Sequence, residues 1–183
     1  MLLPSEHNRL EKYCDEQTVI CLDRLKSDGE IICSEWSHIW GNFCAELCQY
    51  ECTIEFIEIS LLRSYVLKDS PLIFLFEAFD EMWIIDGLIY TQQTAMKTIA
   101  DIILCFRDSV YKEARRHVGR FPRPIAEKTF LVYLQKIEKY IADVLASRIE
   151  CWMFVPDFIA LSRRNLQCSF GGYRFFQNTL YEE

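Results

Sequence analysis

The spacing of apolar residues changes twice along this chain, and that change constrains the fold more than any other feature. Between Trp36 and Cys48 the apolar residues recur at steps of three and four, which is the period of a helix. Residues 53–67 are rich in β-branched and aromatic residues, and 72–79 (LIFLFEAF) are apolar at almost every position, as in buried strands. The helical period then returns from residue 92 onward. The sequence therefore predicts an α+β fold.

Helix-terminating residues mark where the helices begin and end. Ser5 is a suitable N-cap, Gly119 occupies the position of a C′ residue, and Pro124 that of an N1 proline. The last two long helices are separated by a short link, so we expect a long antiparallel αα-hairpin. The expected helices cover about 5–27, 36–50, 92–117, 124–150 and 157–164, and a short strand is expected over 30–33.

The middle of the chain predicts the sheet. Residues 53–67, 72–79 and 82–86 (MWIID) are separated by the turn residues Lys68–Pro71 and Asp80–Glu81. Three strands joined by short turns indicate a small three-stranded antiparallel meander, and helices are expected to cover it. Because 72–79 is apolar on both strand faces, it is expected to be a central strand that is covered on both sides.

The length of 183 residues predicts a single globular domain. It is expected to consist of N-terminal helices (1–52), the β-meander (53–90), and a helical hairpin with an aromatic tail (91–183). The N-terminus lacks the basic and apolar segments of a signal peptide, and the longest charge-free apolar run is Pro71–Phe76. A membrane span needs about 18 such residues. The expected location is therefore cytoplasmic, without membrane association.

Nine cysteines, an odd number in a chain without a secretion signal, favour reduced thiols used as small buried hydrophobes. Cys44, Cys48 and Cys52 are four residues apart, so we expect them to form a core-facing stripe on a helix. Structural zinc sites usually contain C-x2-C pairs and four ligands, which this spacing does not provide. A metal site and a thiol sensor remain alternatives, and no cofactor is expected.

Charge is divided unevenly along the chain. Residues 1–90 contain 6 Lys and Arg against 17 Asp and Glu, whereas residues 91–183 contain 14 against 10. A candidate anion- or partner-binding cluster gathers at the expected hairpin tip: Arg115, Arg116, His117, Arg120 and Arg123. These cations could be solvated groups that complement a helix dipole, they could pair with the acidic half within or between chains, or they could contact nucleic-acid phosphates.

Glu77 is unusual because it shares a strand face with Ile73, Leu75 and Phe79. A carboxylate in such surroundings needs a partner or a raised pKa. Arg63, on the preceding strand, is the expected partner in a structural ion pair. A catalytic carboxylate and an exposed edge position are the alternatives.

The aromatic residues suggest an interface or a large core. Tyr173, Phe175 and Phe176 of the tail are candidate partner-binding residues, because aromatic side chains dominate interface hot spots. There are three histidines, and neither a G-x-S-x-G motif nor a phosphate-binding glycine loop occurs. We therefore expect a non-catalytic interaction or regulatory domain that binds a protein partner or a second copy of itself. The alternatives are a nucleic-acid-binding accessory protein using the basic 107–123 stretch, and a small enzyme or metalloprotein using the cysteine stripe or Glu77.

Overall fold

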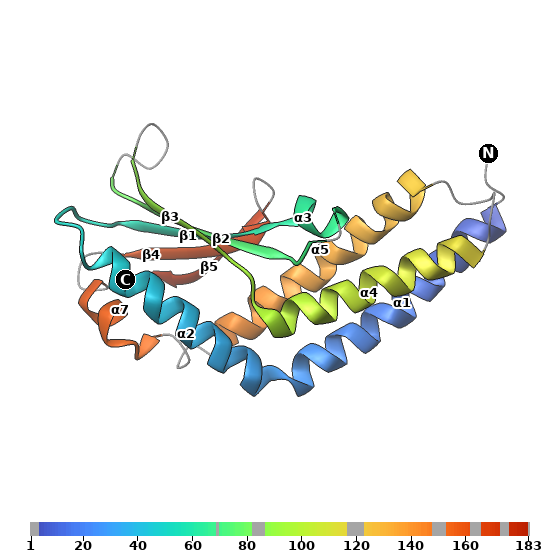
Figure 1. Cartoon of the computed structure of the whole chain (residues 1–183), viewed down its shortest axis with the longest axis horizontal. Coiled ribbons are helices and arrows are strands. Elements are labelled where there is room, and N and C mark those ends of the chain that lie inside the picture. The colour runs from blue at the N-terminus through green and yellow to red at the C-terminus, as the bar shows by residue number, and fades with distance from the viewer. Residues whose placement is uncertain are drawn as a thin grey trace.

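The computed structural model describes residues 4–68, 70–81, 87–116, 123–147, 153–161, 166–172 and 176–182. It has the predicted α+β architecture (Figure 1). The helices are α1 (Pro4–Ser27), α2 (Gly29–Leu47), α3 (Arg63–Leu67), α4 (Lys97–Arg116), α5 (Arg123–Ser147) and α7 (Pro156–Leu161). The strands are β1 (Phe56–Leu62), β2 (Ile73–Phe79), β3 (Leu88–Thr94), β4 (Gln167–Gly172) and β5 (Phe176–Glu182).

The sheet has five strands in the order β3-β2-β1-β4-β5. β1, β2 and β3 are consecutive antiparallel neighbours, as a meander requires. The predicted size of three strands was wrong, because β4 pairs in parallel with β1 and β5 pairs antiparallel with β4. The predicted third strand at 82–86 lies outside the described residues, and the observed third strand is β3. Local patterns did not reveal β4 because its pairing with β1 joins segments from opposite ends of the chain.

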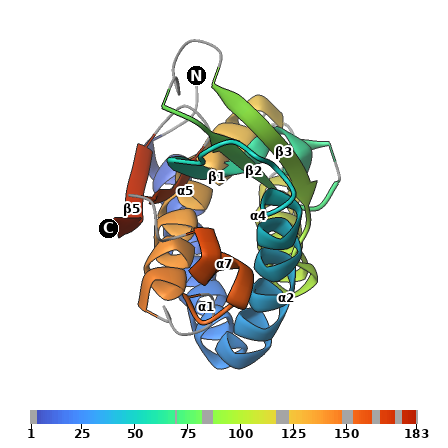
Figure 2. The same ribbon diagram turned by 90° about the vertical axis from the view of Figure 1, so that its left-hand side faces the viewer.

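The long helices α1, α2, α4 and α5, together with α7, lie on one face of the sheet (Figures 1 and 2). The strand residues that face them are at most 2% exposed: Ile57, Ile59, Leu61, Phe74, Phe76 and Ala78. The other β2 residues alternate to the opposite face, where Glu77 is half-buried. The expectation that helices cover β2 on both faces was therefore wrong. Glu77 is tolerated in this apolar strand because it lies on the face away from the helices.

Aromatic rings fill the space between α2 and the sheet. The rings of Trp36 and Trp40 stack with centroids 6.2 Å apart and an angle of 8° between their planes. Trp36 also contacts Phe74 and Phe76, and Trp40 contacts Phe158 of α7. Both tryptophans are 1% exposed. These two therefore belong to the core and are not available to a partner.

The strand predicted at 30–33 is instead the first turn of α2. The amide of Asp28 donates to the Arg24 carbonyl, and the amide of Ile32 donates to the Asp28 carbonyl. Helical hydrogen bonding thus passes almost unbroken from α1 into α2. Ile32 and Cys33 are buried while Ile31 is exposed, which places the neighbouring residues on different sides of a helix.

The predicted αα-hairpin is matched only in part. α4 and α5 follow one another and touch, but α1 packs against both, so the three form a helical bundle rather than an isolated hairpin. Residues 92–94 of the expected first hairpin helix belong to β3, and the link with Gly119 lies outside the described residues. Across the described residues, no helix is both long and apolar enough to cross a membrane.

Candidate functional site

A hollow of about 240 Å³ lies where the C-terminal end of α2 meets α7. Cys48 follows α2 directly, and its amide donates to the Cys44 carbonyl. Its thiol lies 3.6 Å from the backbone carbonyl of Asp157 in α7, a contact that joins segments 109 residues apart. The hollow is lined by Leu47, Cys48, Tyr50, Cys52, Ile54, Ala160 and Leu161.

Three large apolar side chains are exposed in this part of the chain: Tyr50 lines the hollow, Ile159 precedes the lining residue Ala160, and Phe154 lies two residues before α7. Tyr50 is 42% exposed, Phe154 is 74% exposed, and Ile159 is 41% exposed. Within α7, Phe158 points inward and is only 1% exposed, so the helix is anchored by one side chain while Ile159 remains at the surface. Exposed aromatic and aliphatic groups beside a concave surface are typical of protein interaction sites. We call these three residues together with the hollow the α2–α7 surface.

Two carboxylates act on groups at or beside the α2–α7 surface. The last turn of α2 contains no basic residue, so no side chain of that turn compensates the negative end of the helix dipole. Burial, with a smaller contribution from Asp157, raises the pKa of the Cys48 thiol. Burial, with a smaller contribution from Glu46, raises the pKa of Tyr90, whose ring contacts Tyr50. These shifts show that carboxylates act on the groups around the hollow.

The cysteine stripe is divided by the end of α2. Cys44 is buried, whereas Cys48 and Cys52 are exposed. The stripe prediction is therefore correct for Cys44 only, because the chain leaves the helix after Leu47 and the four-residue spacing no longer selects one face. Among the described residues, no group of three or more His, Cys, Asp or Glu side chains could hold a metal ion.

Two of the five residues of the basic cluster are paired within their own helices. Arg116 pairs with Glu113 at 3.0 Å, and Arg123 pairs with Glu127 at 2.7 Å. Arg115 is exposed. His117 and Arg120 lie outside the described residues. The structure therefore supports local pairing on the helix for two of these cations.

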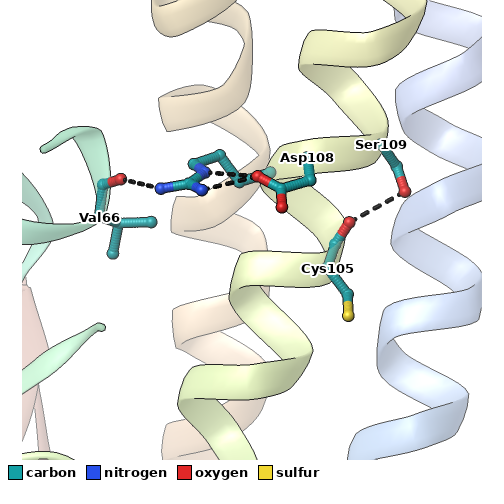
Figure 3. Close-up of polar contacts among 5 residues, drawn as sticks. Val66, Cys105, Asp108 and Ser109 are labelled. Atoms are coloured by element: carbon teal, nitrogen blue, oxygen red, sulfur yellow. Dashed lines mark hydrogen bonds and ion pairs between the residues drawn. The ribbon is translucent and has the colours of Figure 1, made fainter. Parts of the chain in front are cut away.

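Arg107, the first residue of the basic stretch, is buried. Its Nη1 donates to the Val66 carbonyl at 2.8 Å, and its Nε and Nη2 both donate to Asp108 Oδ1 (Figure 3). The guanidinium also lies over the Tyr111 ring, 6.0 Å from its centroid. Arg107 therefore ties α4 to α3 and is not available to bind an anion.

Replacing Arg107 with methionine is expected to lower the free energy of unfolding by about 1–3 kcal/mol, because it leaves the Val66 carbonyl without this donor. The measurement is urea unfolding of both proteins. Arg115→Met is the matched control, since Arg115 is exposed and its loss is expected to change stability by at most about 0.5 kcal/mol. Equal losses in the two variants would contradict a tethering role for Arg107.

The strand register corrects the predicted Arg63–Glu77 ion pair. Leu62 pairs with Ile73 and Glu58 pairs with Glu77, so Glu77 lies five residues along the ladder from Arg63. Arg63 instead donates from Nε to both carboxylate oxygens of Glu138 in α5, at 2.8 Å each. The Glu138 side chain is 0% exposed and that of Arg63 is 15% exposed. Glu138 belongs to a helix 75 residues away, and no local pattern marked it as the partner.

The aromatic tail contributes to the sheet. Phe170 of β4 is buried and contacts Phe74, and Phe176 is the first residue of β5. Tyr173 and Phe175 lie outside the described residues. The proposal that the tail binds a partner is not tested by these positions.

Sequence reasoning missed Tyr50, Phe154 and Ile159. The proline at position 156 is the only local signal near them, since it marks the start of the short α7. Comparison of the chain with protein-family models, with curated proteins and with solved structures finds no match. The case for a function therefore depends on the geometry of the surface.

Proposed function

We propose that this protein is a non-catalytic interaction domain that binds another protein through the α2–α7 surface. The observation that carries the proposal is the combination of a 240 Å³ hollow with the exposed side chains of Tyr50, Phe154 and Ile159. A hollow of this size accepts one or two apolar side chains, and the exposed groups would surround them. Burying such anchors supplies most of the binding free energy in protein interfaces.

Charge indicates what kind of partner fits. Asp157 and Glu46 influence groups at the hollow, and Glu51 lies between two of its lining residues, Tyr50 and Cys52. A Lys or Arg beside the partner's apolar anchor would meet this negative potential and the negative end of α2. The partner is therefore a protein segment that combines an apolar anchor with a nearby basic residue.

The same charge argues against a second copy of this chain as the occupant. In a symmetric dimer each surface meets its own copy, so the carboxylates of one α2–α7 surface would face those of the other. Like charges brought together at an interface cost on the order of several kcal/mol. We therefore commit to a different protein.

Site-specific photo-crosslinking in the source cells tests this function. Benzoylphenylalanine at position 154 preserves the aromatic character of Phe154 and is expected to give one recurrent adduct. The same group at Val132, which is 51% exposed on α5, is the matched control and is expected to give no such adduct. The cross-linked segment of the partner should contain Lys or Arg close to an apolar residue, and Ile159→Asp should weaken binding at least tenfold.

Three results would overturn the proposal. They are the absence of an adduct at position 154, the same adduct from position 132, and an adduct with the mass of two copies of this chain. Because Phe154 and Ile159 are exposed, their substitution should leave the unfolding midpoint nearly unchanged. A change in binding can then be separated from a loss of fold.

A further inference from the structure

A second cleft, separate from the α2–α7 surface, is lined by two thiols from neighbouring helices. It lies between α1 and α4, has a volume of about 330 Å³, and includes Cys21 from α1 and Cys105 from α4. Cys105 is exposed, whereas Cys21 is 3% exposed. The cleft is lined by Gln17, Ile20, Cys21, Arg24, Ile102, Cys105, Phe106, Asp108 and Ser109.

The positions of the lining residues show that the two cysteines occupy the contact stripe of each helix. On both helices the lining residues recur at steps of three and four, and α1 and α4 pack against each other. In Figure 3 the Cys105 sulfur and the Ser109 hydroxyl lie on the side of α4 next to α1. Cys105 therefore points toward the helix that carries Cys21.

Helix packing brings such positions within reach of a disulfide. Packed helix axes are about 8–10 Å apart and each Cα lies about 2.3 Å from its axis, so facing Cα atoms approach to about 3.5–5.5 Å. Slightly offset positions then fall within the range of about 4.4–6.8 Å that disulfides use. The two thiols also interact electrostatically. Burial raises the pKa of Cys21 to about 12, the charge of Arg24 lowers this pKa, and Cys105 raises it further.

We propose that Cys21 and Cys105 form a peroxide-sensitive thiol pair that closes into a disulfide between α1 and α4. Cys105 is the attacking thiol because it is exposed, and Cys21 is the resolving thiol. The Cys105 sulfur attacks a hydroperoxide, so that an S–O bond forms, the O–O bond breaks and an alcohol leaves. The Cys21 sulfur then attacks the sulfenic acid, an S–S bond forms, and water leaves with the Cys21 proton. Two thiols lose two electrons in total, and the hydroperoxide gains them.

The surroundings of Cys21 and Cys105 make oxidation selective for this pair. Cys14 and Cys44 are fully buried, which keeps them from the oxidant. Arg24 is the cation of the cleft and favours the thiolate of Cys21. The sulfenic acid on Cys105 precedes the disulfide, because Cys105 is the thiol that the oxidant reaches.

Oxidation of the full-length protein with hydrogen peroxide, followed by peptide mapping without reduction, tests this pair. Digestion after acidic residues separates Cys21 from Cys14, because Asp15 and Glu16 lie between them. The expected product is a Cys21–Cys105 linked peptide with the loss of two hydrogens, preceded by a sulfenic acid at Cys105. The disulfide closes a long loop and should raise the midpoint of thermal unfolding by several degrees.

Matched variants distinguish the possible outcomes. Cys105→Ser should remove both the linked peptide and the rise in the midpoint, whereas a Cys48→Ser/Cys52→Ser double variant should retain both. Because Cys105, Cys48 and Cys52 are exposed, these variants are expected to fold. Three results would overturn the proposal: Cys105 linked to another cysteine, a disulfide that forms only in denaturant, or a rise that persists in Cys105→Ser.

Discussion

Glu138→Ala is expected to lower the free energy of unfolding by about 3–5 kcal/mol, the largest loss from a single charge change among the residues that the structure describes. The Glu138 side chain is completely buried and accepts two hydrogen bonds from Arg63 Nε. Removing it leaves the guanidinium of Arg63 in a mostly buried position without its carboxylate. Chemical unfolding followed by circular dichroism measures the loss. A loss below about 1 kcal/mol would contradict the importance of this pair.

The double variant Arg63→Met/Glu138→Leu is the control for that result. Replacing both charges by apolar groups of similar size leaves neither charge unpaired, so its loss should be smaller than that of Glu138→Ala. The difference between the stability losses of the single and the double variant separates the cost of an unpaired buried charge from the cost of lost packing. A double variant at least as unstable as Glu138→Ala would indicate that packing dominates.

The Arg63–Glu138 pair also predicts an unusual dependence of protein stability on pH. Burial raises the pKa of Glu138, and the hydrogen bond and charge of Arg63 lower it, with burial dominating. An acid with a raised pKa in the folded state contributes most to stability below its unfolded pKa of about 4.3, and this contribution is lost as the pH rises through the folded pKa. The stability of the natural protein relative to Glu138→Gln should therefore fall as the pH rises from 4. A relative rise over this range would contradict the assigned direction.

Trp36→Ala is expected to lower the free energy of unfolding by about 3–5 kcal/mol. The Trp36 ring is 1% exposed and lies between Trp40, Phe74 and Phe76, so its removal leaves a cavity between α2 and the sheet. The measurement is urea unfolding, with the slope compared to confirm that the variant unfolds cooperatively.

Trp36→Phe is the matched control for this cavity. The Trp36 indole N–H has no hydrogen-bond partner within the described part of the chain. Replacement by phenylalanine therefore removes ring volume but breaks no hydrogen bond. Its loss should be less than half that of Trp36→Ala. Similar losses for the two variants would show that the effect does not scale with the volume removed.

The main predicted helices and the strand at 72–79 lie near those observed because their signals are local. The strand predicted over 53–67 is observed only at Phe56–Leu62, and its last residues form the short helix α3 (Arg63–Leu67). The apolar period of 92–117 predicted a helix that is observed at Lys97–Arg116, and 72–79 predicted a strand that is observed at Ile73–Phe79. The strand predicted at 30–33 failed because three or four residues carry too little periodicity to distinguish a strand from one helical turn. The glycine at position 29 also suggested a break that the hydrogen bonds of Asp28 and Ile32 bridge.

The candidate sites were predicted less well, because each depends on where distant segments meet. Glu77 was expected to pair with Arg63 because of their proximity in the hairpin, but in the fold Arg63 pairs with Glu138 of α5. Arg107 was grouped with surface cations because its neighbours are cationic, although packing against α3 buries it.

By itself, the sequence determined the α+β class, the approximate positions of the main helices and the strand character of the segments that form β1 and β2. These properties follow from residue spacing within one element. Only the tertiary structure decided the parallel pairing of β1 with β4, the covering of the sheet on one face, and the α2–α7 surface formed by segments 109 residues apart. The physical reason is that the spacing of apolar residues within a helix or strand fixes which face of that element each residue occupies. The residues that it contacts on other elements depend on how the whole chain folds.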